Sequence, residues 1–335
     1  MTYAAANPVF DAAMAYQRTA ALVAAVKLDV FTAIGSGAVS LDTLASRTGA
    51  SPRGLRMLCD FLVAIELLKK EGSVYSLTDS SRVLLDERSP FAMGSIVDFV
   101  AAPEMLSLFL EDPVSYVRRG GSDGLANIEA DHPVWVRFAR GMVPFAAATA
   151  RRVAAYVAAL PDRPLTVLDV AAGHGMYGIE VAKVLPDALV TSLDWEGVLA
   201  VARGHAEAAG VADRFRLVAG NALTQEWGKD FDLILLPNFL HHFDVETCTS
   251  LLRKVRASLS TGGLALGVDF VPNEDRISPP LPAMFAFWML ASTPAGDAYT
   301  AGELNRMAQN AGFQGATTRP LPPTPQTLII FVNKD

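Results

Sequence analysis

A glycine-containing loop between a short apolar run and a helical stretch constrains the fold of this 335-residue chain more than any other feature. The segment extends from Val167 to Gly178 and reads Val-Leu-Asp-Val-Ala-Ala-Gly-His-Gly-Met-Tyr-Gly. Small residues let a backbone approach a ligand closely, and the start of the following helix offers free N–H groups. The segment therefore predicts a strand, a tight turn and a helix that together bind a nucleoside or nucleotide.

An acidic residue follows this loop at the spacing of a ribose-binding carboxylate. Gly173, Gly175 and Gly178 satisfy G-x-G-x-x-G. Asp194 ends the next predicted strand, 194 − 175 = 19 residues after the second glycine. In dinucleotide-binding proteins a carboxylate at this distance accepts hydrogen bonds from ribose hydroxyls. Because NAD and S-adenosylmethionine both contain an adenosine ribose, the loop and Asp194 alone leave both cofactors open.

The second half of the chain alternates short apolar runs with helical stretches. The apolar runs span residues 166–170, 189–193, 216–218, 233–236 and 264–268. Strands that alternate with helices form parallel sheets with helical crossovers. Two further runs, 312–317 and 327–332, flank a proline-rich turn and predict a hairpin with an antiparallel last strand. We therefore expect an α/β, Rossmann-like domain over residues 161–335, beginning at the cluster Pro161-Asp162-Arg163-Pro164.

Residues 1–90 are predicted to form a winged helix-turn-helix domain. Apolar residues recur at helical spacing from residue 8 to residue 34. Three further helices are predicted from the residues that open them, Ser40, Pro52 and Thr78. The domain is expected to be all-helical except for one short strand, Val74–Leu77.

The stretch after the fourth predicted strand carries a clear likeness to known proteins. Residues 235–248 read Leu-Leu-Pro-Asn-Phe-Leu-His-His-Phe-Asp-Val-Glu-Thr-Cys, and residues 169–175 read Asp-x-Ala-x-Gly-x-Gly. Over nearly its whole length the chain resembles the two-domain class I S-adenosylmethionine-dependent O-methyltransferases, the plant caffeate type and its bacterial relatives. The resemblance implies a Rossmann-like catalytic domain and a winged-helix domain that forms a homodimer. It also implies S-adenosylmethionine as the cofactor and S-adenosylhomocysteine as its product.

The same resemblance assigns the catalytic residues. His241, seven residues before Cys248, corresponds to the family's catalytic base, and Asp269 to the first carboxylate that orients it. The family's second orienting carboxylate falls at Ala298 by strict register, with Asp297 one residue away, so its presence stays open. A neutral imidazole within hydrogen-bond reach of a phenol takes up the phenolic proton during methyl transfer.

The residues expected to contact the cofactor follow the predicted strands. By resemblance, the strand-end acid Asp169 holds the amino-acid end of the cofactor. Ala171 stands where the family has glycine, His242 where it has a carboxylate, and Asn221 where many relatives have an acid that binds the adenine amine. The complete expected set is Asp169, Ala171, Gly173, Gly175, Asp194, Trp195, Asn221, Ala222 and Asn238.

The acceptor is expected to bind between predicted linker helices, residues 91–160, and the catalytic domain. Aromatic and methionine side chains gather in both regions, and apolar walls suit a flat aromatic or polyketide-like small molecule. An ordinary core or a subunit interface would show the same spacing. The candidates are Trp135, Phe138, Met142, Phe145, Met284, Phe285, Phe287, Trp288 and Met289. The sequence does not identify the acceptor.

No metal site is predicted. His241, His242 and Asp244 are close in sequence, but adjacent side chains point in different directions, and no His or Cys cluster supplies further ligands. The two cysteines, Cys59 and Cys248, lie far apart in sequence and are expected to be packed thiols.

Charge and hydropathy argue against other classes of protein. The net charge is −7, and residues 1–150 contain 13 basic and 16 acidic residues, whereas nucleic-acid readers need basic surfaces. No apolar window reaches the length of about 20 residues that a membrane-spanning helix needs, and no basic region precedes the first apolar segment. The protein is therefore expected to be cytoplasmic, with no nucleic-acid or membrane partner, and to place its surplus apolar residues at a subunit interface.

Three alternatives remain open from the sequence. A C- or N-methyltransferase, or a relative that binds the cofactor without methylating, needs no base at His241. An NAD-dependent oxidoreductase would use the glycine pattern as a dinucleotide fingerprint. A ligand-sensing regulator would bind DNA through the winged helix, but the helix from Pro52 has only Arg53 and Arg56 as basic residues.

Overall fold

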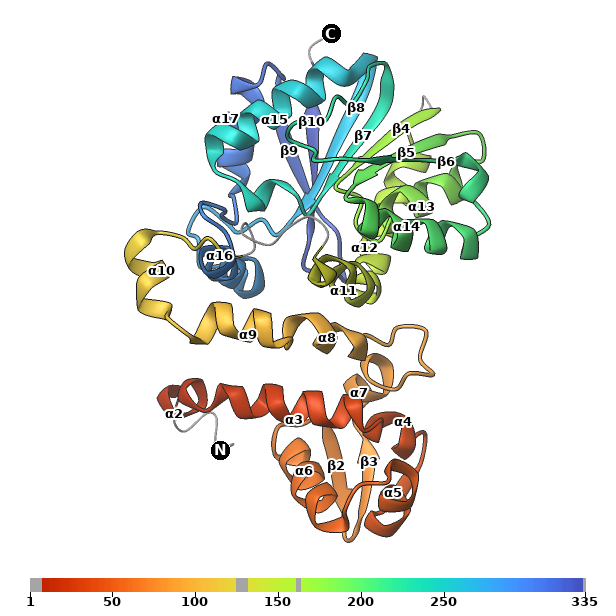
Figure 1. Ribbon diagram of the computed structural model, residues 1–335, viewed down its shortest axis with the longest axis vertical. Coiled ribbons are helices and arrows are strands. Elements are labelled where there is room, and N and C mark those ends of the chain that lie inside the picture. Colours follow the sequence, from red (N-terminus) through yellow and green to blue (C-terminus); the bar gives the residue numbers. More distant parts are fainter. Residues whose placement is uncertain (1–7, 125–131, 161–163, 334–335) are drawn as a thin grey trace. The chain divides into compact units, whose positions relative to one another are not determined.

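The computed structural model describes residues 8–124, 132–160 and 164–333 (Figure 1). Its internal contacts divide the chain into two compact units, Met1–Met105 and Leu106–Asp335. The division falls within α9 (Pro103–Leu110), so the predicted linker helices are shared between the units. The boundary predicted at the proline cluster includes residues 161–163, which lie outside the described residues. The division into residues 1–90, 91–160 and 161–335 therefore stays a prediction.

The first unit consists of short helices and a small sheet. Side chains at three helix starts support the predicted boundaries: Ser40, Ser51 and Thr78 each accept a hydrogen bond from a backbone N–H in the first turn. The elements are α2 (Pro8–Ala13), α3 (Ala15–Lys27), α4 (Val30–Ile34), β1 (Ala38–Ser40), α5 (Leu41–Thr48), α6 (Pro52–Ala64), β2 (Leu68–Glu71), β3 (Val74–Leu77), α7 (Asp79–Leu84), η1 (Gly94–Ile96) and α8 (Val97–Val100).

Two details of this unit differ from the sequence-based expectation. The helix expected over residues 8–34 is three helices, and Asp29, just before α4, has a positive φ of 55°. The unit is also not all-helical, because the predicted strand β3 lies between β1 and β2 in an antiparallel sheet. The strand β2 reads Leu-Lys-Lys-Glu, which has no apolar alternation and therefore gave no strand signal.

The second unit contains a seven-stranded sheet in the order β6-β5-β4-β7-β8-β10-β9. The neighbours from β6 to β8 pair in parallel, and β10 is antiparallel to both β8 and β9, which confirms the predicted Rossmann-like sheet and its hairpin. The strands are β4 (Thr166–Val170), β5 (Leu189–Asp194), β6 (Phe215–Ala219), β7 (Phe231–Pro237), β8 (Leu259–Asp269), β9 (Gly315–Pro320) and β10 (Thr327–Val332). The helices are α10 (Pro113–Arg119), α11 (Pro133–Gly141), α12 (Val143–Ala158), α13 (Met176–Val184), α14 (Glu196–Ala208), η3 (Ala212–Arg214), η4 (Leu240–His242), α15 (Val245–Ser258), α16 (Pro280–Ser292) and α17 (Ala301–Asn310).

Helices cover both faces of this sheet (Figure 1). Leu168 and Val170 of β4 belong to a core shared with α15 and α17, whereas Val167 belongs to a core shared with α12 and α13. Strands that are buried on both faces have continuous apolar sequences, and for this reason the runs were visible in the sequence. No helix within the described residues is both long and apolar enough to cross a membrane.

The carboxyl ends of the parallel strands lie at one edge of the sheet. Asp169 is the second-last residue of β4, and Asp194 and Asp269 are the last residues of β5 and β8. In open α/β sheets ligands bind beyond these ends, at the point where the strand order reverses, here between β4 and β7. The fold therefore gathers the predicted cofactor and catalytic residues at this edge.

Candidate active site

The loop after β4 has a backbone conformation that favours small residues. Ala171, Gly173 and Gly175 have positive φ values of 53°, 59° and 74°. A Cβ atom on Gly175 would lie 3.0 Å from the Cβ of Ala202 in α14, so a larger residue would push α14 away. Ala171 therefore carries a Cβ in a conformation where glycine is preferred, which explains why the resembling family has glycine there.

Replacement of Ala171 by glycine is expected to stabilise the protein. A left-handed backbone costs a residue with a Cβ about 1–2 kcal/mol, and the extra freedom of glycine in the unfolded chain offsets part of the relief. We expect Ala171→Gly to raise the free energy of unfolding, measured by urea denaturation, by about 0.5–1 kcal/mol. The control is Ala172→Gly, at a neighbour without a positive φ, which should lower it. A lower value for Ala171→Gly would contradict backbone strain at this position.

Both carboxylate oxygens of Asp194 accept backbone hydrogen bonds, one of them from this loop. Oδ2 accepts a hydrogen bond from the N–H of Gly173, and Oδ1 accepts one from the N–H of Trp195, each at 2.7 Å. Burial raises the pKa of Asp194 to about 6, although these two N–H groups oppose the shift. A carboxylate has about four acceptor positions, so Asp194 retains the capacity to accept two more hydrogen bonds, from a vicinal diol for example.

Asp169 is a fully buried carboxyl group with one unused oxygen. Oδ2 accepts a hydrogen bond from the N–H of Gly178 at 3.1 Å, while Oδ1 has no hydrogen-bond partner within the described residues. Burial raises the pKa of Asp169 to about 8, and the charge of Asp194 adds to the increase. Buried polar atoms are nearly always hydrogen-bonded. The orphaned Oδ1 therefore indicates a place for a cationic or N–H-donating group of a ligand.

The remaining residues of the predicted cofactor set lie on neighbouring segments of the same edge. Trp195 precedes α14, and the N–H of Gly220 donates to the Asp194 carbonyl at 3.0 Å, which places the Asn221 turn beside β5. The side-chain oxygen of Asn221 already accepts the N–H of Leu223 at 2.9 Å. It retains one acceptor position for an amine, as the resemblance requires.

Ala222 and Asn238 complete that set. Ala222 is buried, and its carbonyl accepts a hydrogen bond from Nε1 of Trp227 at 3.0 Å. Asn238 follows β7 with a positive φ of 54°, and its side chain contacts Tyr177 of α13 at 3.4 Å. Ala222 therefore lies beside Trp227, and Asn238 lies beside the first turn of α13.

His241 and Asp269 form a buried hydrogen-bonded pair. Nδ1 of His241 lies 2.7 Å from Oδ1 of Asp269, and each residue is only 5% exposed. The N–H of Phe270 donates to the same carboxylate oxygen at 2.9 Å and fixes its position. If Nδ1 carries the proton that is shared with Asp269, Nε2 of His241 has a free lone pair. The pair thus has the geometry of a base with its orienting carboxylate.

Asp297 contacts His241 through its backbone instead of its carboxylate. Its N–H donates to the His241 carbonyl at 3.0 Å, and a Cβ on the preceding Gly296 would lie only 2.2 Å from that carbonyl. The carboxylate of Asp297 accepts hydrogen bonds from Arg276 at 3.1 Å and from the N–H of Ala298 at 2.8 Å. The second orienting carboxylate that the sequence left open is therefore not supplied by the Asp297 side chain.

The ring of His242 lies next to that of His241, the catalytic candidate. The two imidazole rings lie 4.3 Å apart between centroids, with an interplanar angle of 55°. Burial, and then the neighbouring His241, hold the pKa of His242 well below its usual value. The neutral ring of His242 therefore adds no positive charge next to His241.

A row of aromatic rings leads to His241. Phe285 of α16 lies edge-on to His241 at 4.9 Å, Phe270 lies 4.3 Å from Phe285, and Phe145 of α12 lies 6.0 Å from Phe270 in a stacked arrangement. Phe145 and Phe285 were predicted from the sequence. Phe270 was not, although its position directly after the strand-end Asp269 was a usable signal.

The structure gives individual positions for the other acceptor candidates. Trp135 packs in a cluster with Trp195 between α11 and α14, and Trp288 contacts Phe109 at 4.9 Å. Met289 is buried, whereas Met284 is 67% exposed. The three remaining candidates lie on or next to two helices. Phe138 is partly buried on α11, Met142 lies at the end of α11, and Phe287 of α16 is exposed beside Tyr116.

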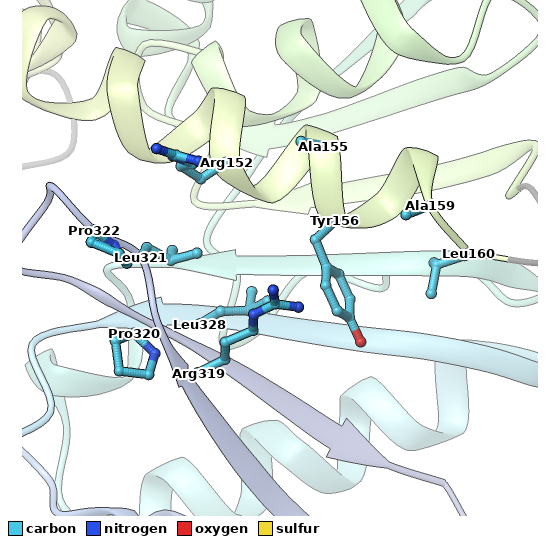
Figure 2. A pocket seen from close by; sticks show the side chains of 10 residues that line it. All are labelled: Arg152, Ala155, Tyr156, Ala159, Leu160, Arg319, Pro320, Leu321, Pro322 and Leu328. Atoms are coloured by element: carbon cyan, nitrogen blue, oxygen red, sulfur yellow. The ribbon is translucent and has the colours of Figure 1, made fainter.

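Two hollows of the second unit lie outside the predicted site. Figure 2 shows one of about 580 Å³ between α12 and the β9–β10 hairpin, with Arg152, Tyr156 and Arg319 among its lining residues. The other, of about 350 Å³, is lined by residues of α14 and of the segment 212–217. None of the predicted site residues lines either hollow. Within the described part of the chain, no group of three or more His, Cys, Asp or Glu side chains is placed to hold a metal ion.

Comparison with known proteins identifies relatives of both units. An O-methyltransferase domain family matches residues 110–314, and an O-methyltransferase dimerisation domain family matches residues 10–87. A crystal structure of a candidate O-methyltransferase from Nostoc punctiforme PCC 73102 is 45% identical, covers 96% of this chain and 97% of its own, and has a TM-score of 0.92.

Two curated relatives are more distant. The tetracenomycin polyketide synthesis 8-O-methyl transferase of Streptomyces glaucescens is 26% identical, with 92% of each chain covered. The acetylserotonin O-methyltransferase of Mus musculus molossinus is 28% identical, with 91% of this chain and 83% of the relative covered. The similarity to all three proteins thus spans both units of the chain.

Proposed function

Because the chain belongs to the O-methyltransferase family, whose methyl donor is S-adenosylmethionine, we propose that it methylates a hydroxyl group of an aromatic or polyketide-like small molecule with His241 as general base. The observation that carries the proposal is the buried His241–Asp269 pair, which lies at the carboxyl edge of the sheet beside Phe285. The match of residues 10–87 to a dimerisation domain supports a homodimer formed through the first unit.

The residues at the sheet edge fit S-adenosylmethionine. The spare acceptor positions of Asp194 suit the two ribose hydroxyls, and the orphaned Oδ1 of Asp169 suits the ammonium group of the amino-acid end. The side-chain oxygen of Asn221 keeps one acceptor position, which suits the adenine amine. When bound, the cofactor supplies an electrophilic methyl group on a sulfonium leaving group. The protein has to bind, orient and desolvate the reaction partners.

His241 accepts the hydroxyl proton of the methyl acceptor, and Asp269 assists it. A phenol with a pKa of about 10 is mostly protonated at neutral pH, so its oxygen becomes a strong nucleophile only as the proton leaves. The proton moves to Nε2 of His241, and the carboxylate on Nδ1 stabilises the resulting imidazolium. Because both residues are buried, water is kept from competing for these positions.

The aromatic row supports an aromatic acceptor. Phe285 and Phe270 place ring surfaces next to the imidazole, and aromatic pairs prefer offset or edge-on contacts at centroid distances of about 4.5–7 Å. A flat ring bound against Phe285 would present its hydroxyl group close to His241. The two curated relatives are named for O-methylation of a polyketide and of acetylserotonin, which agrees with this choice.

The proposal is tested by comparing acceptors that differ in a single group. We expect the purified protein to transfer labelled methyl from S-adenosylmethionine to naphthols or hydroxyindoles, and not to the matching methoxy compounds. Matched arylamines report N-methylation, and mass spectrometry of the product reports C-methylation. Calorimetry should detect binding of S-adenosylhomocysteine and none of NADH. Products methylated only on carbon or nitrogen, or binding of NADH alone, would refute O-methylation.

A further inference from the structure

Three side chains from distant segments of the second unit form a closed ring of hydrogen bonds. The Tyr177 hydroxyl donates to Oε1 of Gln326 at 3.5 Å, Nε2 of Gln326 donates to Oδ1 of Asn238, and Nδ2 of Asn238 donates to the Tyr177 oxygen at 3.4 Å. Each residue thus donates one hydrogen bond and accepts one. Tyr177 and Gln326 are 2% and 1% exposed, so water does not substitute for these partners.

The ring joins the cofactor loop to both halves of the catalytic pair. Tyr177 lies in the first turn of α13, directly after the loop. Asn238 lies three residues before His241, and its N–H donates to the carbonyl of Val268, the residue before Asp269, at 2.7 Å. Gln326 precedes Thr327, which is the β10 residue paired with Asp269.

Asn238 has an uncommon backbone conformation in the segment that leads to His241. Its φ of 54° lies in the left-handed region, which asparagine adopts more readily than most residues with a Cβ. The segment from Asn238 to His241 is short and leaves β7 directly. Burial also raises the pKa of Tyr177, so its hydroxyl keeps the proton that the ring requires. A change in any member would therefore release the backbone that carries His241.

We propose that Tyr177, Asn238 and Gln326 act as one positioning unit that sets His241 and Asp269 relative to the cofactor loop. The inference rests on the proposed function, because it concerns the alignment of the base with the acceptor and the methyl donor. None of the three side chains is assigned a proton transfer. Small misplacements of reacting groups lower rates strongly because the geometry of attack is lost. The expected defect is therefore in kcat more than in affinity for the cofactor.

A double-mutant cycle tests whether the ring acts as a unit. The variants are Tyr177→Phe, Gln326→Met and the combination of both, and each single change opens the same ring. We expect each single variant to lose about ten-fold in kcat and the double variant to lose no more than either, because residues that act together are non-additive. The loss should shrink for more acidic phenols, which depend less on proton removal by His241.

Tyr75→Phe serves as the matched control. Tyr75 is also 2% exposed and its hydroxyl donates to Asp60 in the first unit at 2.8 Å, so its loss should leave kcat unchanged. If Gln326→Met does not fold, Gln326→Glu takes its place, because it keeps the side-chain length and replaces the amide donor by a carboxyl oxygen. Losses that multiply in the double variant, or a kcat that is unchanged in the single variants, would overturn the proposal. A wild-type protein that methylates no hydroxyl group would instead refute the proposed function.

Discussion

A His241→Ala variant is expected to lose about 10²–10⁴-fold in kcat while its affinity for S-adenosylhomocysteine stays unchanged. The loss follows from the geometry, because the 2.7 Å hydrogen bond that Nδ1–H of His241 donates to Asp269 leaves Nε2 to receive the acceptor's proton. The partner of His241, Asp269, and its neighbour Phe285 lie outside the cofactor loop, so the cofactor site should be preserved. The measurement is methyl transfer at saturating substrates, with calorimetry of S-adenosylhomocysteine on the same preparation.

Two further variants define the role of this residue. Asp269→Asn should also lower kcat, because an amide can accept at one atom and donate at the other and no longer fixes a single tautomer of His241. His132→Asn is the control: the side chain of His132 caps α11 by accepting the N–H of Val134, and asparagine is also a good helix cap. A His241→Ala variant with less than about ten-fold loss would mean that proton removal by this side chain is not part of the reaction.

An Asp194→Ala variant is expected to bind S-adenosylhomocysteine about 100-fold more weakly. A hydrogen bond to a charged group contributes about 1.5–3 kcal/mol, so two ribose hydroxyls on one carboxylate account for about 3 kcal/mol, or two orders of magnitude in Kd. The variant also frees the N–H groups of Gly173 and Trp195, which Asp194 holds at 2.7 Å. Calorimetry at pH 7.5 measures the change, and unchanged affinity would remove Asp194 from the cofactor site.

The same carboxyl group predicts how binding depends on pH. The pKa of Asp194 in the free protein is about 6, so its carboxylate becomes protonated as the pH falls below that value. The protonated carboxyl group is a weaker acceptor of hydrogen bonds from the ribose hydroxyls. Affinity for adenosine, which has the ribose but lacks the amino-acid end that Asp169 would bind, should weaken by up to ten-fold per pH unit below pH 6. The dependence should disappear in Asp194→Ala.

The protonation of Asp194 also changes the stability of the fold, and the sign of that change distinguishes weaker adenosine binding from acid unfolding. A carboxyl group with a raised pKa contributes stability that is fully present below its unfolded value of 3.8 and is lost as the pH rises through about 6. Protonation of Asp194 therefore does not destabilise the free protein between pH 6 and pH 5. Weaker adenosine binding in that range, with a melting temperature that does not fall, would locate the effect in the site.

Much of the site could be predicted because its residues occupy the ends of apolar strands. Asp169, Asp194 and Asp269 each stand at the end of a run that the sequence shows clearly, and parallel strands bring such ends to one edge. Gly173 and Gly175 signalled the loop, since positive φ values call for glycine. Ala171 shows the limit of this reasoning, because it adopts the same conformation without being glycine.

Other parts of the site depend on contacts between segments that are far apart in sequence. Asp297 was one residue from the expected register, yet Arg276 binds its carboxylate, which is not placed on His241. Trp135 was grouped with the acceptor candidates because of its residue type, whereas it packs beside Trp195. Gln326 carried no signal at all, since a single polar residue in a proline-rich turn has no periodicity to interpret.

The sequence by itself determined the strand–loop–helix unit and the parallel sheet with its antiparallel hairpin. It also determined the family resemblance that assigned His241 and Asp269. These features are local, because they are encoded by apolar periodicity and by glycine at positions that need a special backbone. Only the tertiary structure decided that the Asp297 carboxylate binds Arg276 and not the imidazole, which rings line up next to His241, and that Tyr177, Asn238 and Gln326 close a ring. Where two segments pack together, the direction of a side chain depends on the position of both segments. The spacing of residues along one segment therefore does not predict that direction.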